Sequence, residues 1–144
     1  MANDWRSELN KIIDNRVKMT RAELESARFV QFLESVVMPA LEELKTELEK
    51  HDRKAAVRQT TISATITVSS GDTEEISYRI LSRSLPVGIV PYAEVRMRKG
   101  QRLVKAESNL KGNTPTGTIE HVTAADVIAS FLSYFRAALD SGQA

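Results

Sequence analysis

The sequence predicts an α+β protein with a long, kinked N-terminal helical segment, a four- to five-stranded antiparallel meander sheet and a C-terminal helix packed on the sheet's apolar face. Two observations carry this prediction. Apolar residues recur every three or four positions near both ends of the chain, as in amphipathic helices. In the middle they recur at every second position, as in strands with one buried face. Each element has one apolar face to cover, so we expect a single domain, 1–144, in which helices and sheet cover each other.

The N-terminal helical segment is expected to span residues 1–56. Asn3 or Asp4 can cap its start, because their side-chain oxygens accept hydrogen bonds from free backbone amides. The first apolar positions are Trp5, Leu9, Ile12, Ile13 and Val17. Thr20 and Glu23 then match a capping box, the reciprocal side-chain arrangement found at helix starts. Either a second helix begins at this point or the first helix continues through it.

The apolar stripe continues from Leu24 to Leu48, and the helix that carries it could reach about Lys54. A helix of that length would measure roughly 50 Å at 1.5 Å per residue, which exceeds the diameter of a small domain. It must therefore break, bend or project. Pro39 has no amide hydrogen and clashes with the preceding turn, so the sequence predicts a kink there.

This stripe also suggests a second copy of the chain as partner. Val30, Val37 and Leu44 lie seven residues apart, as in a coiled-coil seam. The predicted homo-oligomer interface consists of Val30, Leu33, Val37, Leu41 and Leu44. Core packing within one chain explains the same stripe equally well, and Pro39 disfavours a regular coiled coil.

The sheet is expected to occupy residues 57–122. Polar and apolar residues alternate there, and Ser70-Gly71-Asp72 is a turn signal. The predicted strands cover residues 61–68, 76–83, 93–98 and 103–107, with a further short edge strand at 118–122. Between them, the sequence predicts a loop at Ser84–Pro91 and an exposed loop at Lys111–Gly117.

The final helix is expected over residues 123–142. Thr123 and Asp126 have the spacing of a helix-start cap, and Gly142 can close the helix. Its apolar positions are Val127, Ile128, Phe131, Leu132, Phe135 and Leu139.

Composition limits the classes of partner. Twenty basic and nineteen acidic side chains leave a net charge of +1, so the whole molecule has no strong attraction to nucleic acid or anionic lipid. The absence of cysteine excludes disulfides, thiolate metal ligands and a cysteine nucleophile. The first residues lack an apolar signal core, and no apolar stretch approaches the roughly 20 residues that span a bilayer. We therefore expect a cytoplasmic protein without a membrane partner.

Motifs for catalysis are missing. His51 and His121 lie 70 residues apart with no ligand pattern around them, so no metal site is predicted. Neither a nucleophile elbow nor a phosphate-binding glycine loop is present, and no catalytic residue or cofactor is assigned. These absences favour a protein without enzymatic activity. The alternative is an enzyme whose site lies at Ser84–Pro91 or Lys111–Gly117.

The polar face of the predicted sheet carries the sharpest functional feature. Guanidinium groups suit phosphate and carboxylate recognition because their planar donors form paired hydrogen bonds. The candidate ligand-binding residues are Arg79, Arg83, Arg96, Arg98 and Lys105. Glu94 and Glu107 share this face and can pair with the arginines, which is an ordinary way to solvate an open sheet. Of the aromatic residues, Tyr92 alone could stack on a base there.

The sequence thus supports two functional hypotheses. The leading one is a small binding or interaction module that acts as a homo-oligomer. The alternative is a nucleic-acid or phospho-ligand binder that uses the arginine-rich face.

Overall fold

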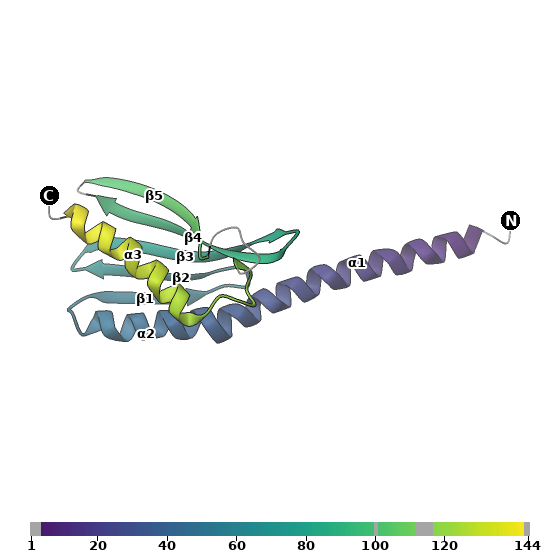
Figure 1. The fold of residues 1–144 in the computed structure, drawn as a ribbon, viewed down its shortest axis with the longest axis horizontal. Coiled ribbons are helices and arrows are strands. Elements are labelled where there is room, and N and C mark those ends of the chain that lie inside the picture. The colour runs from purple at the N-terminus through teal and green to yellow at the C-terminus, as the bar shows by residue number, and fades with distance from the viewer. Residues whose placement is uncertain (1–3, 100, 112–116, 143–144) are drawn as a thin grey trace.

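The computed structural model describes residues 4–99, 101–111 and 117–142, except for the side chains of 16–20, 99 and 141–142. It confirms the predicted α+β fold. A long N-terminal helix, a five-stranded antiparallel sheet and a C-terminal helix follow one another along the chain (Figure 1). Both helical segments pack against the same face of the sheet, and no helix of the described residues covers the opposite face.

The N-terminal segment is helical without interruption. It consists of α1 (Asp4–Phe32), one π-helical turn, η1 (Leu33–Val37), and α2 (Met38–Glu49). The irregular turn directly precedes Pro39, which stands in the first turn of α2. Within it, the amide of Met38 donates to the carbonyl of Leu33, five residues back. The expected kink is present, but it is spread over the turn before the proline.

The alternative start of a second helix at Thr20–Glu23 does not occur, because α1 runs through these residues. Phe29 is the first buried residue of α1, and the described side chains before it are all exposed. Figure 1 shows the N-terminal part of α1 extending far beyond the sheet. The excess helix length is therefore accommodated by projection as well as by a bend.

The sheet is a meander in which each strand pairs antiparallel with the next. Gly71 adopts φ +62°, a conformation that glycine reaches without strain, in the turn between the second and third strands. The strands are β1 (Lys54–Gln59), β2 (Ala64–Ser70), β3 (Thr73–Leu85), β4 (Gly88–Lys99) and β5 (Arg102–Asn109).

The fifth strand lies at the other edge from the one predicted. Residues 118–122 form no strand; instead β1 runs from Lys54 to Gln59, across the end of the segment expected to be helical and ahead of the first predicted strand at 61–68. The helix ends at Glu49, and Asp52 turns the chain with a left-handed φ of 60°. In β1 the side chains at every second position that turn to the core include Ala55 and Val57. The residue between them, Ala56, is apolar too, so the sequence shows only a weak alternation of apolar and polar residues here.

Two strand boundaries also differ from prediction. The expected loop at Ser84–Pro91 is a tight hairpin, in which β3 runs to Leu85 and β4 begins at Gly88. Ile62, placed in the first predicted strand, is 67% exposed in the turn between β1 and β2. That turn closes when the amide of Thr60 donates to the carbonyl of Ser63 at 2.8 Å. The alternation of apolar residues does not show at which residue the hydrogen bonding between two strands ends.

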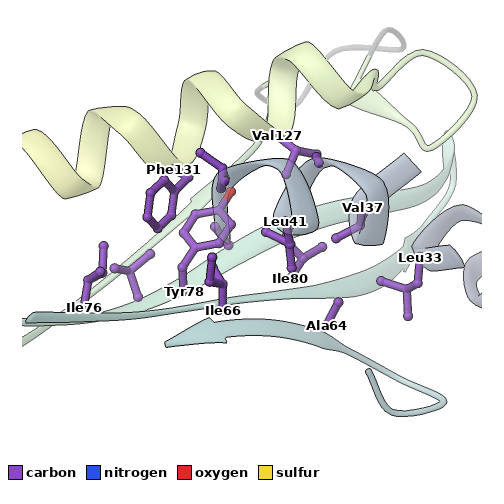
Figure 2. Close-up of a cluster of buried hydrophobic side chains, with 14 of the residues drawn as sticks. Leu33, Val37, Leu41, Ala64, Ile66, Ile76, Tyr78, Ile80, Val127 and Phe131 are labelled. Atoms are coloured by element: carbon purple, nitrogen blue, oxygen red, sulfur yellow. The ribbon is translucent and has the colours of Figure 1, made fainter. Parts of the chain in front are cut away.

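The core lies between the sheet and the helices (Figure 2). Alternate residues of β2 and β3 meet side chains from η1, α2 and α3. Tyr78 packs edge-to-face on Phe131, with ring centroids 5.6 Å apart. Its hydroxyl donates to Oγ of Ser130 at 2.8 Å, and burial raises the pKa of Tyr78. The labelled core residues are Leu33, Val37, Leu41, Ala64, Ile66, Ile76, Tyr78, Ile80, Val127 and Phe131.

The start of α3 (Ala124–Gly142) is capped as the sequence predicts. The carboxylate of Asp126 accepts hydrogen bonds from the amide of Thr123 at 2.9 Å and from its hydroxyl at 3.1 Å. In return, the Asp126 amide donates to the Thr123 hydroxyl at 3.3 Å. The backbone hydrogen bond from Thr123 is the main cause that lowers the pKa of Asp126.

This cap gives stability a pH dependence. A lowered pKa means that the folded protein binds the proton less tightly, so the contribution is complete above the unfolded pKa of about 3.9 and is lost as the pH falls through the folded pKa. We expect Asp126→Asn to lower the free energy of unfolding at neutral pH by about 0.3–1 kcal/mol. The difference from the parent should shrink in acid, as measured by urea denaturation at several pH values. Asp140→Asn, near the other end of α3, is the control. A pH-independent difference would contradict the prediction.

Candidate functional site

The open face of the sheet is the surface turned away from the helices. In β3, Ile76, Tyr78 and Ile80 point to the core, so Arg79 and Arg83 point to the open face. Strand register places Arg79 opposite Glu94, and Arg96 opposite Lys105. By the same alternation the five predicted ligand-binding residues, Arg79, Arg83, Arg96, Arg98 and Lys105, all belong to this face.

Three of these five cations are paired with glutamates. Nη1 of Arg79 lies 3.9 Å from Oε1 of Glu94, and Arg83 pairs with Glu107. The third pair, Arg96 with Glu74, has N···O distances of 3.0–3.2 Å and uses both Nε and Nη2 of the arginine. These side chains are between about one-third and one-half exposed, and ion pairs in such positions contribute little to stability. They do, however, neutralise part of the face.

Glu74, the partner of Arg96, was not among the residues predicted for this face. The register between β2 and β3 shifts at Val68/Ser69, so that Ser69 lies opposite Glu74 rather than Glu75. The bulge turns Glu74 to the open face, while Glu75 forms a 2.7 Å ion pair with Arg53 on the other side. This hydrogen bond is the main cause that raises the pKa of Arg53. Strict alternation along the sequence hides such a shift.

The aromatic residue of the open face is already in use. The guanidinium carbon of Arg83 lies 4.0 Å from the ring centroid of Tyr92, a cation–π contact. This contact occupies one face of the ring that could otherwise stack on a nucleic-acid base.

Arg98 and Lys105 have no ion-pair partner among the residues that the structure describes. In β1, Ala55 is buried, so the alternating Lys54 and Arg58 also belong to the open face. They too are unpaired within the described chain. Neither residue was predicted for this face, because Lys54 fell in the predicted helical segment and Arg58 came before the first predicted strand at 61–68.

A shallow hollow of about 140 Å³ lies in the open face. It is smaller than the roughly 300 Å³ at the lower end of small-molecule pockets. Its lining is mostly polar and comprises Ser77, Arg79, Glu94, Val95, Arg96 and Lys105. The hollow suits contact with part of a larger anionic ligand better than enclosure of a small one.

The projecting part of α1 carries the second unusual surface. Its large apolar side chains are 46–58% exposed. We call them the α1 stripe: Trp5, Leu9, Ile12, Ile13 and Leu24. Leu9 precedes the buried Phe29 by 20 residues, or about five and a half turns at 3.6 residues per turn, so the centre of the stripe points away from the protein's own sheet.

The residues predicted as an oligomer interface lie elsewhere. Leu33, Val37 and Leu41 are fully buried in the core of the chain itself, and Leu44 is almost so. Val30 is partly buried. Leu33, Val37 and Leu41 therefore leave no surface for a second chain to contact. The same helical spacing of apolar residues fits a core and an interface, and packing within the chain places Leu33, Val37, Leu41 and Leu44, but not Val30, in the core.

The two histidines and the two loops considered as possible enzyme sites form no group of reactive side chains among the described residues. His51 and His121 are exposed, and the described residues contain no cluster of three or more histidine, cysteine or acidic side chains that could hold a metal. At the hairpin once expected to be a loop, Ser84 Oγ donates to Glu25 of α1 at 3.1 Å. The other candidate loop, Lys111–Gly117, lies mostly outside the described residues.

The fold and its surfaces define a small α+β protein with a projecting helix that carries an apolar stripe and with an open, basic sheet face. No family model matches the chain, and no curated protein or solved structure is significantly similar to it. Within the described ranges, no helix is long and apolar enough to cross a membrane.

Proposed function

We propose that this protein is an interaction module that self-associates through the α1 stripe. The observation that carries the proposal is the exposure of five large apolar side chains on a helix that projects from the domain. Single apolar residues on a surface are ordinary, but a group of large apolar side chains such as Trp5, Leu9, Ile12 and Ile13 on successive turns of one helix is typical of an interaction site.

The projecting helix also needs a partner for its own stability. Isolated helices are marginal in water, because nucleation is unfavourable and most helical stability in proteins comes from packing an apolar face. The described side chains of α1 before Phe29 are all exposed, and although Glu25 accepts a hydrogen bond from Ser84, they bury no apolar face within the chain. The 25 residues from Asp4 to Arg28 would form a seam about 37 Å long. Burying the stripe along this seam would remove apolar surface from water and hold the helix together.

A second copy of the chain is the partner that the stripe fits. Two identical apolar stripes are complementary about a two-fold axis, the commonest symmetry of protein oligomers. The direction of the stripe allows this pairing, because it points away from the sheet of its own chain. Two copies can therefore join back to back through α1 while both domains stay on the outside.

Light scattering of a charged stripe variant tests the proposal. The chain has a mass of 16.0 kDa, and we expect the parent protein to scatter as a multiple of that mass. Leu9→Glu with Ile13→Glu should yield the monomer mass and a weaker helical circular dichroism signal, because four new carboxylates would be buried in each dimer.

A matched control uses the opposite side of the same helix. Ser7→Glu with Lys11→Gln changes the net charge by the same two units at the same spacing, and it should leave the oligomer intact. A parent protein that is monomeric at the highest concentration measured would overturn the proposal. So would equal dissociation of both variants.

A further inference from the structure

We propose that the open face of the sheet binds the phosphate backbone of a nucleic acid without reading its bases. The first support is the separation of charge within a nearly neutral chain. Among the described residues, seven cations and three carboxylates share this face, a net charge of +4, whereas the whole chain carries +1. The residues are Lys54, Arg58, Arg79, Arg83, Arg96, Arg98 and Lys105, with Glu74, Glu94 and Glu107.

The second support is the position of the unpaired cations. Lys54 and Arg58 lie on β1, and Arg98 and Lys105 lie on β4 and β5. Three strand spacings of about 4.8 Å separate β1 from β4 and four separate it from β5, so the two groups stand roughly 14–19 Å apart. An anionic chain on the sheet can contact both groups, whereas a single small anion cannot.

Hydroxyl groups fill the space between these cations. Strand register places Thr65 and Thr67 of β2 opposite Arg58 and Ala56 of β1, and Ser77 opposite both Thr67 and Arg96. Lysine, arginine, serine and threonine side chains are the usual donors to phosphate oxygens in nucleic-acid complexes. A strip of hydroxyls between two groups of cations therefore matches a phosphodiester chain.

The open face offers little aromatic surface on which a base could stack. Sheet proteins that read single-stranded bases stack them on exposed aromatic rings. Here the Arg83 guanidinium already occupies one face of the Tyr92 ring. The recognition should therefore rest on phosphate contacts and be independent of base sequence.

Salt-dependent fluorescence anisotropy with a short labelled oligothymidine tests this inference. Four unpaired cations that contact phosphates should give log Kobs a slope of about −3 against log salt, since each contact contributes about 0.7 for a single strand. Affinity should then fall by about 50-fold between 50 and 200 mM salt. Oligoadenosine should bind with a similar slope, and a duplex probe with a slope of about −3.6.

A pair of variants separates a defined site from general attraction. Arg98→Gln with Lys105→Gln should weaken binding and reduce the slope by about 1.4. Lys50→Gln with Arg136→Gln removes two exposed charges from the helical side and should leave the slope unchanged. No binding at low salt would overturn the inference. Equal losses in both variants would do the same, as would binding to anionic lipid vesicles but to no oligonucleotide.

Discussion

Leu41→Ala is expected to lower the free energy of unfolding by about 2–5 kcal/mol and to leave the oligomeric state unchanged. Leu41 is 0% exposed and lies in α2 among the core side chains between helix and sheet (Figure 2). Truncation would remove buried apolar surface and leave a cavity that the closely packed sheet and helices can only partly fill. Urea denaturation measures the stability, and light scattering under native conditions measures the mass.

The comparison variant is Leu24→Ala on the α1 stripe. Leu24 is 53% exposed, so its truncation should reduce self-association while costing the folded domain little. Comparing the two variants thus distinguishes the effect of a core residue on stability from the effect of an interface residue on self-association. Loss of the oligomer in Leu41→Ala at full domain stability would contradict the core assignment and would restore the interface first predicted from heptad spacing.

Phe131→Ala should have a still larger effect, a loss of about 3–5 kcal/mol. Phe131 is fully buried in α3, where it meets Tyr78 edge-to-face and stacks on Phe135 with centroids 5.5 Å apart. Its removal would open a cavity directly above β3 and end both ring contacts. Because α3 is held to the sheet through this region, near-ultraviolet circular dichroism from Tyr78 and Tyr134 should also weaken.

The next residue supplies the control for Phe131. Leu132 belongs to the same helix turn but is 50% exposed, so Leu132→Ala should change the free energy of unfolding by much less. Denaturation of both variants under the same conditions would check the difference. Equal losses at the two positions would mean that α3 packs with a different face toward the sheet.

The two proposed surfaces act independently but can reinforce each other. Self-association through α1 would bring two basic sheet faces into one particle. Two linked sites bind a long nucleic acid more tightly than either site alone, provided both can reach it at once. The monomeric stripe variant should then keep its affinity for a short oligonucleotide and lose affinity only for a long one.

The sequence by itself determined the elements whose local pattern is strong. Alternation in β2 to β4 identified the buried face of the sheet, because successive side chains of a strand must point to opposite sides. The Thr123 and Asp126 spacing located the start of α3, because a cap depends on contacts within one turn. The bend near Pro39 followed from the missing amide hydrogen.

Only the tertiary structure decided which apolar stripe is buried and which cations remain unpaired. The residues from Leu33 to Leu44 and those from Trp5 to Leu24 repeat with the same helical period, and only contact with the sheet separates core from exposed surface. The edge strand β1 needed β2 as a partner to become extended, because Ala55 and Val57 alone define a weak pattern. The pairing of Arg96 with Glu74 depended on a bulge between strands. Such choices are made by contacts between distant segments, which a local sequence pattern does not contain.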